Sequence, residues 1–202
     1  MEDNFIYLEN QSATHRLIFL HGWGADAEDL VPFGRALVNA CKADAKFDLV
    51  FLRAPQLHPD AIGRQWYPLF PADWSSVPDA VEDLQMRIRN LPIMKIPFKK
   101  TFFLGFSQGA AMAIASGFQF DLAGIIACSP YGHPNWDPKY IKPPVLLTHG
   151  SNDDVVPLEA AKIVFKLIKR KQQKSELFIF TGGHEISGEV MDKICSFLEM
   201  YI

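Results

Sequence analysis

One pentapeptide of the sequence combines a nucleophile with the glycine spacing that such a nucleophile needs, namely Gly105-Phe106-Ser107-Gln108-Gly109. It lies between the strand-like run Thr101–Phe106 and the small-residue helical run Ala110–Ser116. A serine in this G-x-S-x-G arrangement is expected in a sharp turn between a strand and a helix, with its hydroxyl exposed above a sheet. The helix N-terminus at the turn favours developing negative charge. The pattern therefore predicts that Ser107 is a nucleophile; the alternative is a serine that only caps a helix.

A serine hydroxyl is a weak nucleophile, so it needs a base that is itself oriented by a carboxylate. In proteins with this serine turn, the carboxylate and then the histidine follow along the chain, each after a strand. Asp153 and Asp154 come soon after the apolar run Val145–Thr148, and His184 follows the run Leu177–Phe180. His184 is also the only histidine after these aspartates. The candidate catalytic groups are the serine, one of the two aspartates and this histidine.

Acyl transfer also needs two N–H groups that can hold an oxyanion. The backbone N–H of Gln108, the residue after the serine, is the first candidate. The second is the backbone N–H of Trp23, which follows the expected strand Arg16–Leu20. Glycines at 22 and 24 allow the chain to turn sharply there and to present this N–H towards the serine.

The same glycines support a competing interpretation. Gly22-x-Gly24-x-x-Ala27, after a strand and before a helix, matches a dinucleotide-binding fingerprint. An acidic residue is then expected at the end of the next strand, but the run Leu49–Leu52 ends in Arg53, which fits only NADP. A strand that precedes this unit and forms a hairpin with it also argues against a dinucleotide site. An NADP-binding Rossmann-type protein remains an alternative.

Short strand-like runs alternate with helical patterns along almost the whole chain. This alternation predicts an α/β fold with a mostly parallel seven-stranded sheet and helices on both faces. The expected strands are Phe5–Leu8, Arg16–Leu20, Leu49–Leu52, Thr101–Phe106, Leu122–Ala127, Val145–Thr148 and Leu177–Phe180. Only residues 9–15 separate the first two strands, so these are expected to pair as a hairpin.

Two irregular segments, 53–76 and 129–144, are rich in proline and aromatic residues and follow the carboxyl ends of strands. Open parallel sheets bind ligands at that edge, so both segments are expected to wall a pocket. In the first segment, we expect Trp66 and Phe70 to wall the acyl site beside Ser107. Because the segment is short, this site should fill at short to medium acyl chains. The alternative is a segment that folds back only to bury itself.

Composition narrows the class of protein. The 202 residues are 49% hydrophobic and 21% charged, which is typical of one globular domain over residues 1–202. The net charge of −3 gives no general reason to bind nucleic acid. No apolar run approaches the roughly 20 residues needed to span a bilayer, and the N-terminus has no signal-peptide pattern. Three cysteines far apart in sequence and histidines without ligand spacing predict no disulfide framework and no metal site, and a cytoplasmic location.

Five runs in the same chain order resemble the phospholipase/carboxylesterase family of α/β-hydrolases, which includes carboxylesterases and acyl-protein thioesterases. The runs are LHGWGAD, GRQWYPL, GFSQGA, HGSNDDVVP and GGH. The resemblance implies a single-domain α/β-hydrolase with strand order 1-3-2-4-5-6-7, no cofactor, and Asp153 as the acid. It implies a serine hydrolase that cleaves an ester or thioester through an acyl-enzyme, with small esters, lipids or acylated proteins as substrates. Trp23 stands where members of the family commonly have an aliphatic residue. This departure concerns the expected substrate and leaves the expected catalytic residues unchanged.

The alternative to an enzyme is a binding protein of the same fold, which would hold a ligand without converting it. A complete set of nucleophile, base and acid argues against it, because binding alone does not need all three groups.

Overall fold

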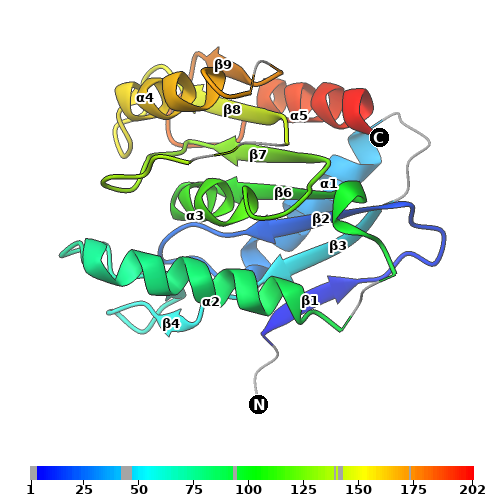
Figure 1. Cartoon of the computed structure of the whole chain (residues 1–202), viewed down its shortest axis with the longest axis horizontal. Helices are drawn as coiled ribbons and strands as arrows, with labels where there is room; N and C mark the ends of the chain where they lie inside the picture. The colour runs from blue at the N-terminus through cyan, green and yellow to red at the C-terminus, as the bar shows by residue number, and fades with distance from the viewer. Residues whose placement is uncertain (1–3, 42–46, 93–94, 139, 141–142, 173) are drawn as a thin grey trace.

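A seven-stranded sheet forms the centre of the molecule (Figure 1). The computed structural model describes residues 4–41, 47–92, 95–138, 140, 143–172 and 174–202. The strands of the sheet are β1 (Phe5–Leu8), β2 (His15–Leu20), β3 (Phe47–Leu52), β6 (Thr101–Phe106), β7 (Gly124–Cys128), β8 (Val145–Gly150) and β9 (Glu176–Phe180). Their order in space is β1-β3-β2-β6-β7-β8-β9, and all neighbours pair in parallel except β1, which is antiparallel to β3. The predicted mostly parallel sheet and its strand order are confirmed.

The expected hairpin between the first two strands is wrong. Strand β1 pairs with β3, so that Phe5 lies opposite Leu52, while β2 has β3 on one side and β6 on the other. Five of the six β2 residues are buried, which places this strand in the middle of the sheet with both edges occupied. Polar contacts fix β1 at the outer edge: Tyr7 Oη donates to Asp48 Oδ2 at 2.9 Å, and the N–H of Asn10 donates to Asp48 Oδ1 at 2.8 Å.

Helices cover both faces of the sheet, as the alternation of strands and helices predicts. One face packs against α2 (Val77–Arg89), α3 (Gln108–Gly117) and α4 (Leu158–Lys169). The other face packs against α1 (Val31–Ala40) and α5 (Gly188–Tyr201). The apolar side chains of these helices make two cores, one on each side of the sheet. The short 3-10 helices are η1 (Ala27–Leu30), η2 (Trp74–Ser76) and η3 (Phe98–Lys100).

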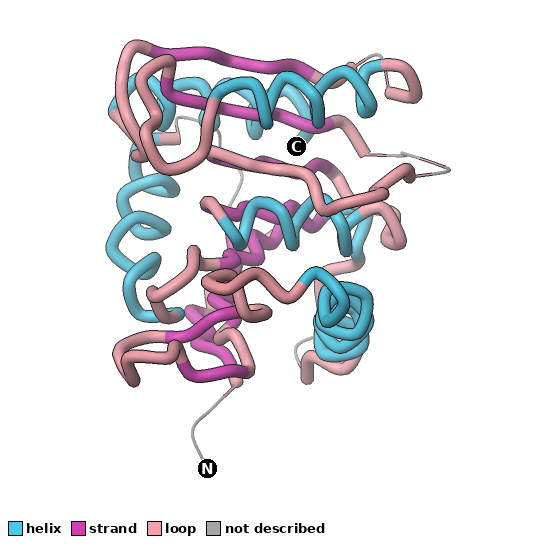
Figure 2. The backbone as a smooth tube through the Cα atoms, turned by 90° about the vertical axis from the view of Figure 1, so that its left-hand side faces the viewer, coloured by secondary structure: helices cyan, strands magenta, loops and turns pink. Residues whose placement is uncertain are grey.

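The carboxyl ends of β2, β6, β7, β8 and β9 lie at one edge of the sheet, because these strands are parallel. Figure 2 views the molecule from the left-hand side of Figure 1 and shows helices on either side of the strands. The loops that follow them carry the residues singled out by the sequence. The segment between β3 and α2 adds a small hairpin of β4 (Gln56–Leu57) and β5 (Arg64–Gln65). This topology brings residues that are far apart in sequence to one place.

Two of the three cysteines meet behind the sheet. The sulfur of Cys41, at the end of α1, lies 2.9 Å from the sulfur of Cys195 in α5, and both are free thiols. Nothing in their spacing of 154 residues indicates this contact.

Among the described residues, no helix combines the length and apolar character needed to cross a bilayer.

Candidate active site

Ser107 occupies the sharp turn between β6 and α3. Its backbone has φ 54° and ψ −118°, in the region of positive φ that residues with a Cβ rarely adopt. The turn is held by two backbone hydrogen bonds, from the N–H of Ser107 to the carbonyl of Cys128 at 2.9 Å and from the N–H of Ala110 to the carbonyl of Ser107 at 2.9 Å. The serine side chain is thus presented at the carboxyl edge of the sheet, directly before the first residue of a helix.

Close backbone packing explains the two glycines around the serine. A Cβ on Gly105 would lie 2.2 Å from the carbonyl oxygen of Gly109. A Cβ on Gly109 would lie 2.1 Å from the carbonyl oxygen of Leu20, at the end of β2. Backbone atoms cannot move aside as the end of a flexible side chain can. The strained serine turn therefore depends on hydrogen atoms at both positions.

A hydrogen bond of 2.8 Å joins His184 Nδ1 to Asp153 Oδ2. The side chain of Asp153 is fully buried, and its other oxygen accepts the N–H groups of Val155 at 3.0 Å and Val156 at 2.8 Å. Asp154 is exposed. Of the two aspartates left open by the sequence, the structure brings Asp153 to the histidine.

These contacts also set the charge of the carboxylate. Burial by itself raises the pKa of Asp153, but the hydrogen bonds from Val156, His184 and Val155 outweigh it and hold the pKa below its ordinary value. The carboxylate is therefore ionised at neutral pH and accepts a hydrogen bond from the protonated Nδ1 of His184. That tautomer leaves Nε2 of the imidazole as a proton acceptor.

The histidine and the serine share one cavity. Both line it, and the ring of His184 lies 4.8 Å from the ring of Phe106, the residue before Ser107. Ser107, His184 and the buried carboxylate of Asp153 thus come together from the ends of β6, β9 and β8.

His149 is a second histidine at the same carboxylate, and the sequence patterns do not single it out. Its Nε2 lies 2.8 Å from the carbonyl oxygen of Val156 and 3.4 Å from Asp153 Oδ2, and the residue is fully buried. Because a carbonyl only accepts, Nε2 carries the proton and helps to fix the loop that holds Asp153. Its place at the end of β8, four residues before the aspartate, is the one signal of this role in the sequence.

Both candidate oxyanion donors lie beside the serine turn. Gln108 is the first residue of α3, where a backbone N–H has no partner within the helix. The loop after β2 passes close to the serine, since a Cβ on Gly22 would lie 3.5 Å from Ser107 Cβ. Trp23 follows in that loop and lines the cavity. The side chain of Gln108 has a separate role, because it accepts the N–H of Trp66 at 3.0 Å and donates to the carbonyl of Tyr67 at 2.8 Å.

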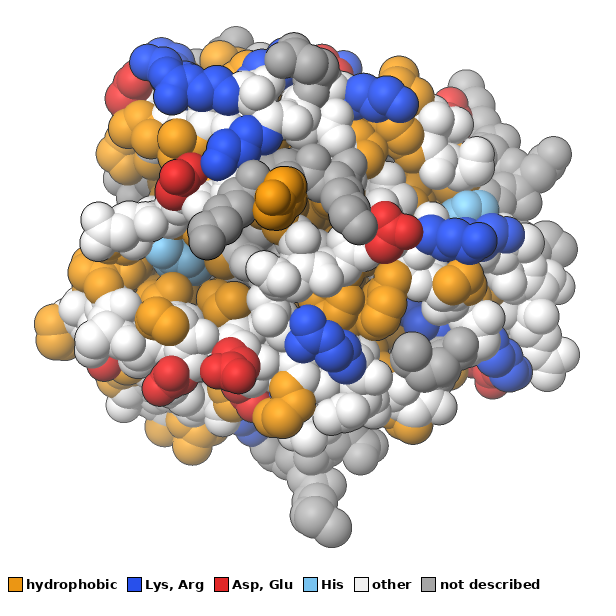
Figure 3. Space-filling view, in the orientation of Figure 1, with side chains coloured by type: hydrophobic (Ala, Val, Ile, Leu, Met, Phe, Trp, Pro, Cys, Tyr) orange, Lys and Arg blue, Asp and Glu red, His pale blue; other side chains and the backbone are white. Residues whose placement is uncertain are grey.

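The cavity in front of Ser107 has a volume of about 630 Å³ and a mostly apolar wall. The two inserted segments contribute Leu69, Phe70, Ala72, Trp74 and Tyr131 to this wall. Figure 3 shows hydrophobic side chains gathered on the left-hand side of the molecule, where the strands end.

Of the two residues predicted to wall the acyl site, Phe70 lines the cavity, whereas the prediction for Trp66 needs correction. Phe70 is on the cavity wall and is 69% exposed. Trp66 is 1% exposed and belongs to the core. Its indole Nε1 donates to the carbonyl of His21 at 2.9 Å, and its backbone N–H donates to Gln108. With both N–H groups satisfied inside the protein, Trp66 anchors the segment instead of facing the cavity.

The structure does not support a dinucleotide site at the Gly22–Gly24 loop. The helix after it, η1, is a single 3-10 turn of four residues whose N-terminus is capped by the side chain of Asp26. Arg53, which would have to meet an NADP phosphate, is paired with Asp26 and Glu28. Among the described residues, no group of three or more potential ligand side chains could hold a metal ion.

Comparisons with known proteins bear on the family and the fold of this chain. The family model described as Phospholipase/Carboxylesterase matches residues 1–202. Acyl-protein thioesterase 1 of Saccharomyces cerevisiae is 26% identical over 94% of this chain and 93% of its own length. Acyl-protein thioesterase 1 of Eremothecium gossypii is 25% identical, and the match spans 67% of this chain but only 62% of that relative. The crystal structure of esterase PE8 superposes with a TM-score of 0.86 at 29% identity, over 98% of both chains.

Proposed function

The chain belongs to the phospholipase/carboxylesterase family, and we propose that it is a serine hydrolase that cleaves carboxylic esters or thioesters through an acyl-enzyme on Ser107. The observation that supports this most directly is the 2.8 Å hydrogen bond between Asp153 and His184, at the cavity that Ser107 also lines.

In this mechanism, His184 Nε2 takes the proton of the Ser107 hydroxyl as the serine oxygen attacks the substrate carbonyl carbon. The backbone N–H groups of Trp23 and Gln108 stabilise the negative charge that develops on the carbonyl oxygen. His184 then donates its proton to the departing alcohol or thiol, which leaves an acyl group on Ser107. In the second half, His184 Nε2 takes a proton from water as the water oxygen attacks the acyl carbonyl carbon. The tetrahedral intermediate then collapses, the bond to the Ser107 oxygen breaks, this oxygen takes the proton back from His184, and the acid is released.

Asp153 stays ionised through both halves. It holds the imidazole in the tautomer with Nδ1 protonated and stabilises the imidazolium that forms when Nε2 takes a proton. His149 and the two backbone N–H groups that surround the carboxylate prevent it from turning away from His184.

The apolar cavity is the proposed acyl site, with Phe70 on its wall. Each buried methylene contributes roughly 0.8 kcal/mol, so kcat/KM should rise about fourfold per added carbon until the site is full. We expect the rise to end at short to medium chains, because the segment that walls the site is short.

Labelling with a fluorophosphonate probe tests the mechanism. The folded protein should be modified at Ser107, and the label should be absent from a folded Ser107→Ala variant and strongly reduced in His184→Ala. The same preparation should hydrolyse simple p-nitrophenyl esters. A folded wild-type protein that neither takes up the label nor hydrolyses these esters would be a ligand-binding protein of this fold, and the proposal would be wrong.

A further inference from the structure

The wall of the proposed acyl cavity contains a set of aromatic rings alongside aliphatic side chains. Besides Phe106 and His184 next to the serine, four aromatic side chains face it: Trp23, Phe70, Trp74 and Tyr131. They form two pairs. The rings of Trp23 and Phe70 are 5.2 Å apart at 75°, and those of Trp74 and Tyr131 are 6.4 Å apart at 73°. Both pairs have the edge-to-face geometry that aromatic rings prefer.

The first pair is anchored through its tryptophan. The indole Nε1 of Trp23 donates to Gln65 Oε1 at 2.9 Å. The ring of His58 packs against the same indole, with centroids 4.0 Å apart at 67°. His58 itself is 8% exposed, so Trp23 is held between a hydrogen bond and a buried ring. Its indole is therefore a fixed wall of the cavity.

The second pair is anchored through its tyrosine. The hydroxyl of Tyr131 lies 2.6 Å from the hydroxyl of Tyr67, which in turn lies 2.9 Å from His133 Nε2. Tyr67 is fully buried, and His133 is 9% exposed. Because the Tyr131 hydroxyl is already bonded inside the protein, this side chain offers the cavity its ring.

Fixed rings and flexible aliphatic chains select different ligands. An aliphatic wall attracts apolar groups in proportion to the area that they bury. Preorganised rings add an edge-to-face or offset-stacked contact that only another aromatic ring completes. That contact is worth about a two- to twelvefold change in affinity beyond the burial of area. The rings of Trp23 and Tyr131 are anchored before the ligand arrives, so little of their side-chain freedom is lost on binding.

We propose that the preferred substrates are esters or thioesters whose acyl group carries an aromatic ring. This inference rests on the proposed function and specifies its substrate class. The acyl ring would lie between the Trp23–Phe70 pair and the Trp74–Tyr131 pair, while the carbonyl meets Ser107.

Two esters of matched shape test the inference. Ethyl 3-phenylpropanoate and ethyl 3-cyclohexylpropanoate have the same carbon skeleton, and the ring is two carbons away from the carbonyl in both. The ethyl group is too small to use the aromatic wall. A site that responds only to apolar area would favour the more hydrophobic cyclohexyl ester. We expect kcat/KM, measured by acid release, to be about three- to tenfold higher for the phenyl ester.

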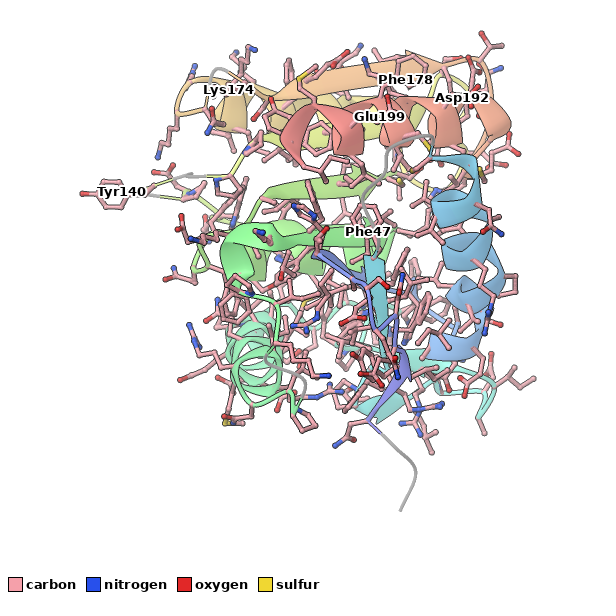
Figure 4. The ribbon with its side chains drawn as sticks, turned by 90° about the vertical axis from the view of Figure 1, so that its right-hand side faces the viewer. Phe47, Tyr140, Lys174, Phe178, Asp192 and Glu199 are labelled. Atoms are coloured by element: carbon pink, nitrogen blue, oxygen red, sulfur yellow. The ribbon has the colours of Figure 1, made fainter. Side chains whose placement is uncertain are left out.

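Phe70→Leu and Trp74→Leu assign the preference to the rings. These side chains are 69% and 39% exposed, so leucine can replace them without opening the core. Each variant should bring the ratio between the two esters towards one, chiefly by slowing the phenyl ester. The control is Tyr140→Leu, because Tyr140 is 80% exposed and projects away from the body of the molecule (Figure 4). This control should leave the ratio unchanged.

The outcomes separate this inference from the proposed function. If the cyclohexyl ester is hydrolysed as fast as or faster than the phenyl ester, the aromatic preference is wrong while the hydrolase stands. The aromatic preference is also wrong if Ser107 takes the fluorophosphonate label but neither ester reacts, or if both leucine variants keep the wild-type ratio. If the folded protein neither takes up the label nor hydrolyses any ester, the proposed function fails.

Discussion

The serine turn and the aromatic segment that faces it are built by different physical means. In the turn, backbone atoms of Gly105 and Gly109 pack so closely that no Cβ fits. In the segment 64–76, the backbone is held by side chains, above all by Gln108, whose amide bonds the main chain at Trp66 and Tyr67. The backbone packing at the serine turn tolerates no substitution of its two glycines. The aromatic segment can change the residues that face the cavity as long as the residues that anchor it stay.

This contrast predicts where function and stability are lost. Changes at the serine edge of the sheet should abolish turnover or folding, and changes in the aromatic segment should alter selectivity or stability by smaller amounts.

The largest effect is expected at the buried carboxylate. Asp153→Asn should lower kcat/KM about 10³- to 10⁴-fold, because an amide cannot hold the imidazole in the working tautomer or stabilise the imidazolium. Asp154→Asn should stay within about twofold of wild type, since this side chain is exposed. Steady-state kinetics with a p-nitrophenyl ester, on variants with wild-type circular dichroism, measures both. The reverse ranking would move the acid to Asp154.

The next effect concerns backbone packing at the turn. Gly109→Ala places a Cβ 2.1 Å from the carbonyl oxygen of Leu20 and should lower the free energy of unfolding by about 3 kcal/mol or more. Gly188→Ala is the matched control, because nothing lies within 4 Å of a Cβ there and alanine favours the helix. Its stability should be unchanged or raised by up to about 1 kcal/mol. Urea unfolding measures the free energy of unfolding of both variants. Equal values for Gly109→Ala and Gly188→Ala would contradict this account of the turn.

The side chain of Gln108, which joins the two regions, can be removed while its backbone N–H, the proposed oxyanion donor, is kept. Gln108→Ala keeps the backbone N–H but leaves the N–H of Trp66 and the carbonyl of Tyr67 without their partner. Each buried unpaired group costs about 1–3 kcal/mol, so we expect the two together to lower the free energy of unfolding by about 2–6 kcal/mol. The preference between the phenyl and cyclohexyl esters should fall as well. Gln119→Ala, at an exposed position, should change neither quantity.

The smallest effect is a pH dependence of stability that comes from His133, which Tyr67 connects to Tyr131 of the second aromatic pair. Burial lowers the pKa of His133 from 6.5 to about 4. Its contribution to stability is therefore complete above pH 6.5 and is lost as the pH falls from 6.5 towards 4, because only the unfolded chain then takes up the proton easily. By pH 4.5 the loss should reach about 2–3 kcal/mol.

His133→Asn, compared with wild type by urea unfolding at pH 7 and pH 4.5, isolates this contribution from that of other titrating groups. We expect the variant to be less stable than wild type at pH 7. Between pH 7 and pH 4.5, its free energy of unfolding should fall by about 2–3 kcal/mol less than that of wild type. Equal losses in the two proteins would show that His133 does not titrate in this range.

Local patterns in the sequence determined the parts of the fold that depend on neighbours along the chain. Alternating strand and helix patterns predicted the parallel sheet with helices on both faces, which the structure confirms. Parallel strands all end at the same edge, so residues just after β6, β8 and β9 had to meet there. The sequence could therefore point to Ser107, His184 and a pair of aspartates before any distance was known.

Tertiary structure decided what depends on contacts between distant segments. The sequence spacing favoured a hairpin for β1, but both edges of β2 are occupied by β3 and β6, and β1 pairs instead with the outer edge of β3. Asp153 and Asp154 are chemically identical, and the direction of the loop after β8 buries one and exposes the other. Trp66 and Phe70 are alike in apolar character, yet hydrogen-bond partners within reach bury the first and leave the second on the cavity wall. In each case the deciding partner comes from another part of the chain, and residue type and local spacing carry no information about it.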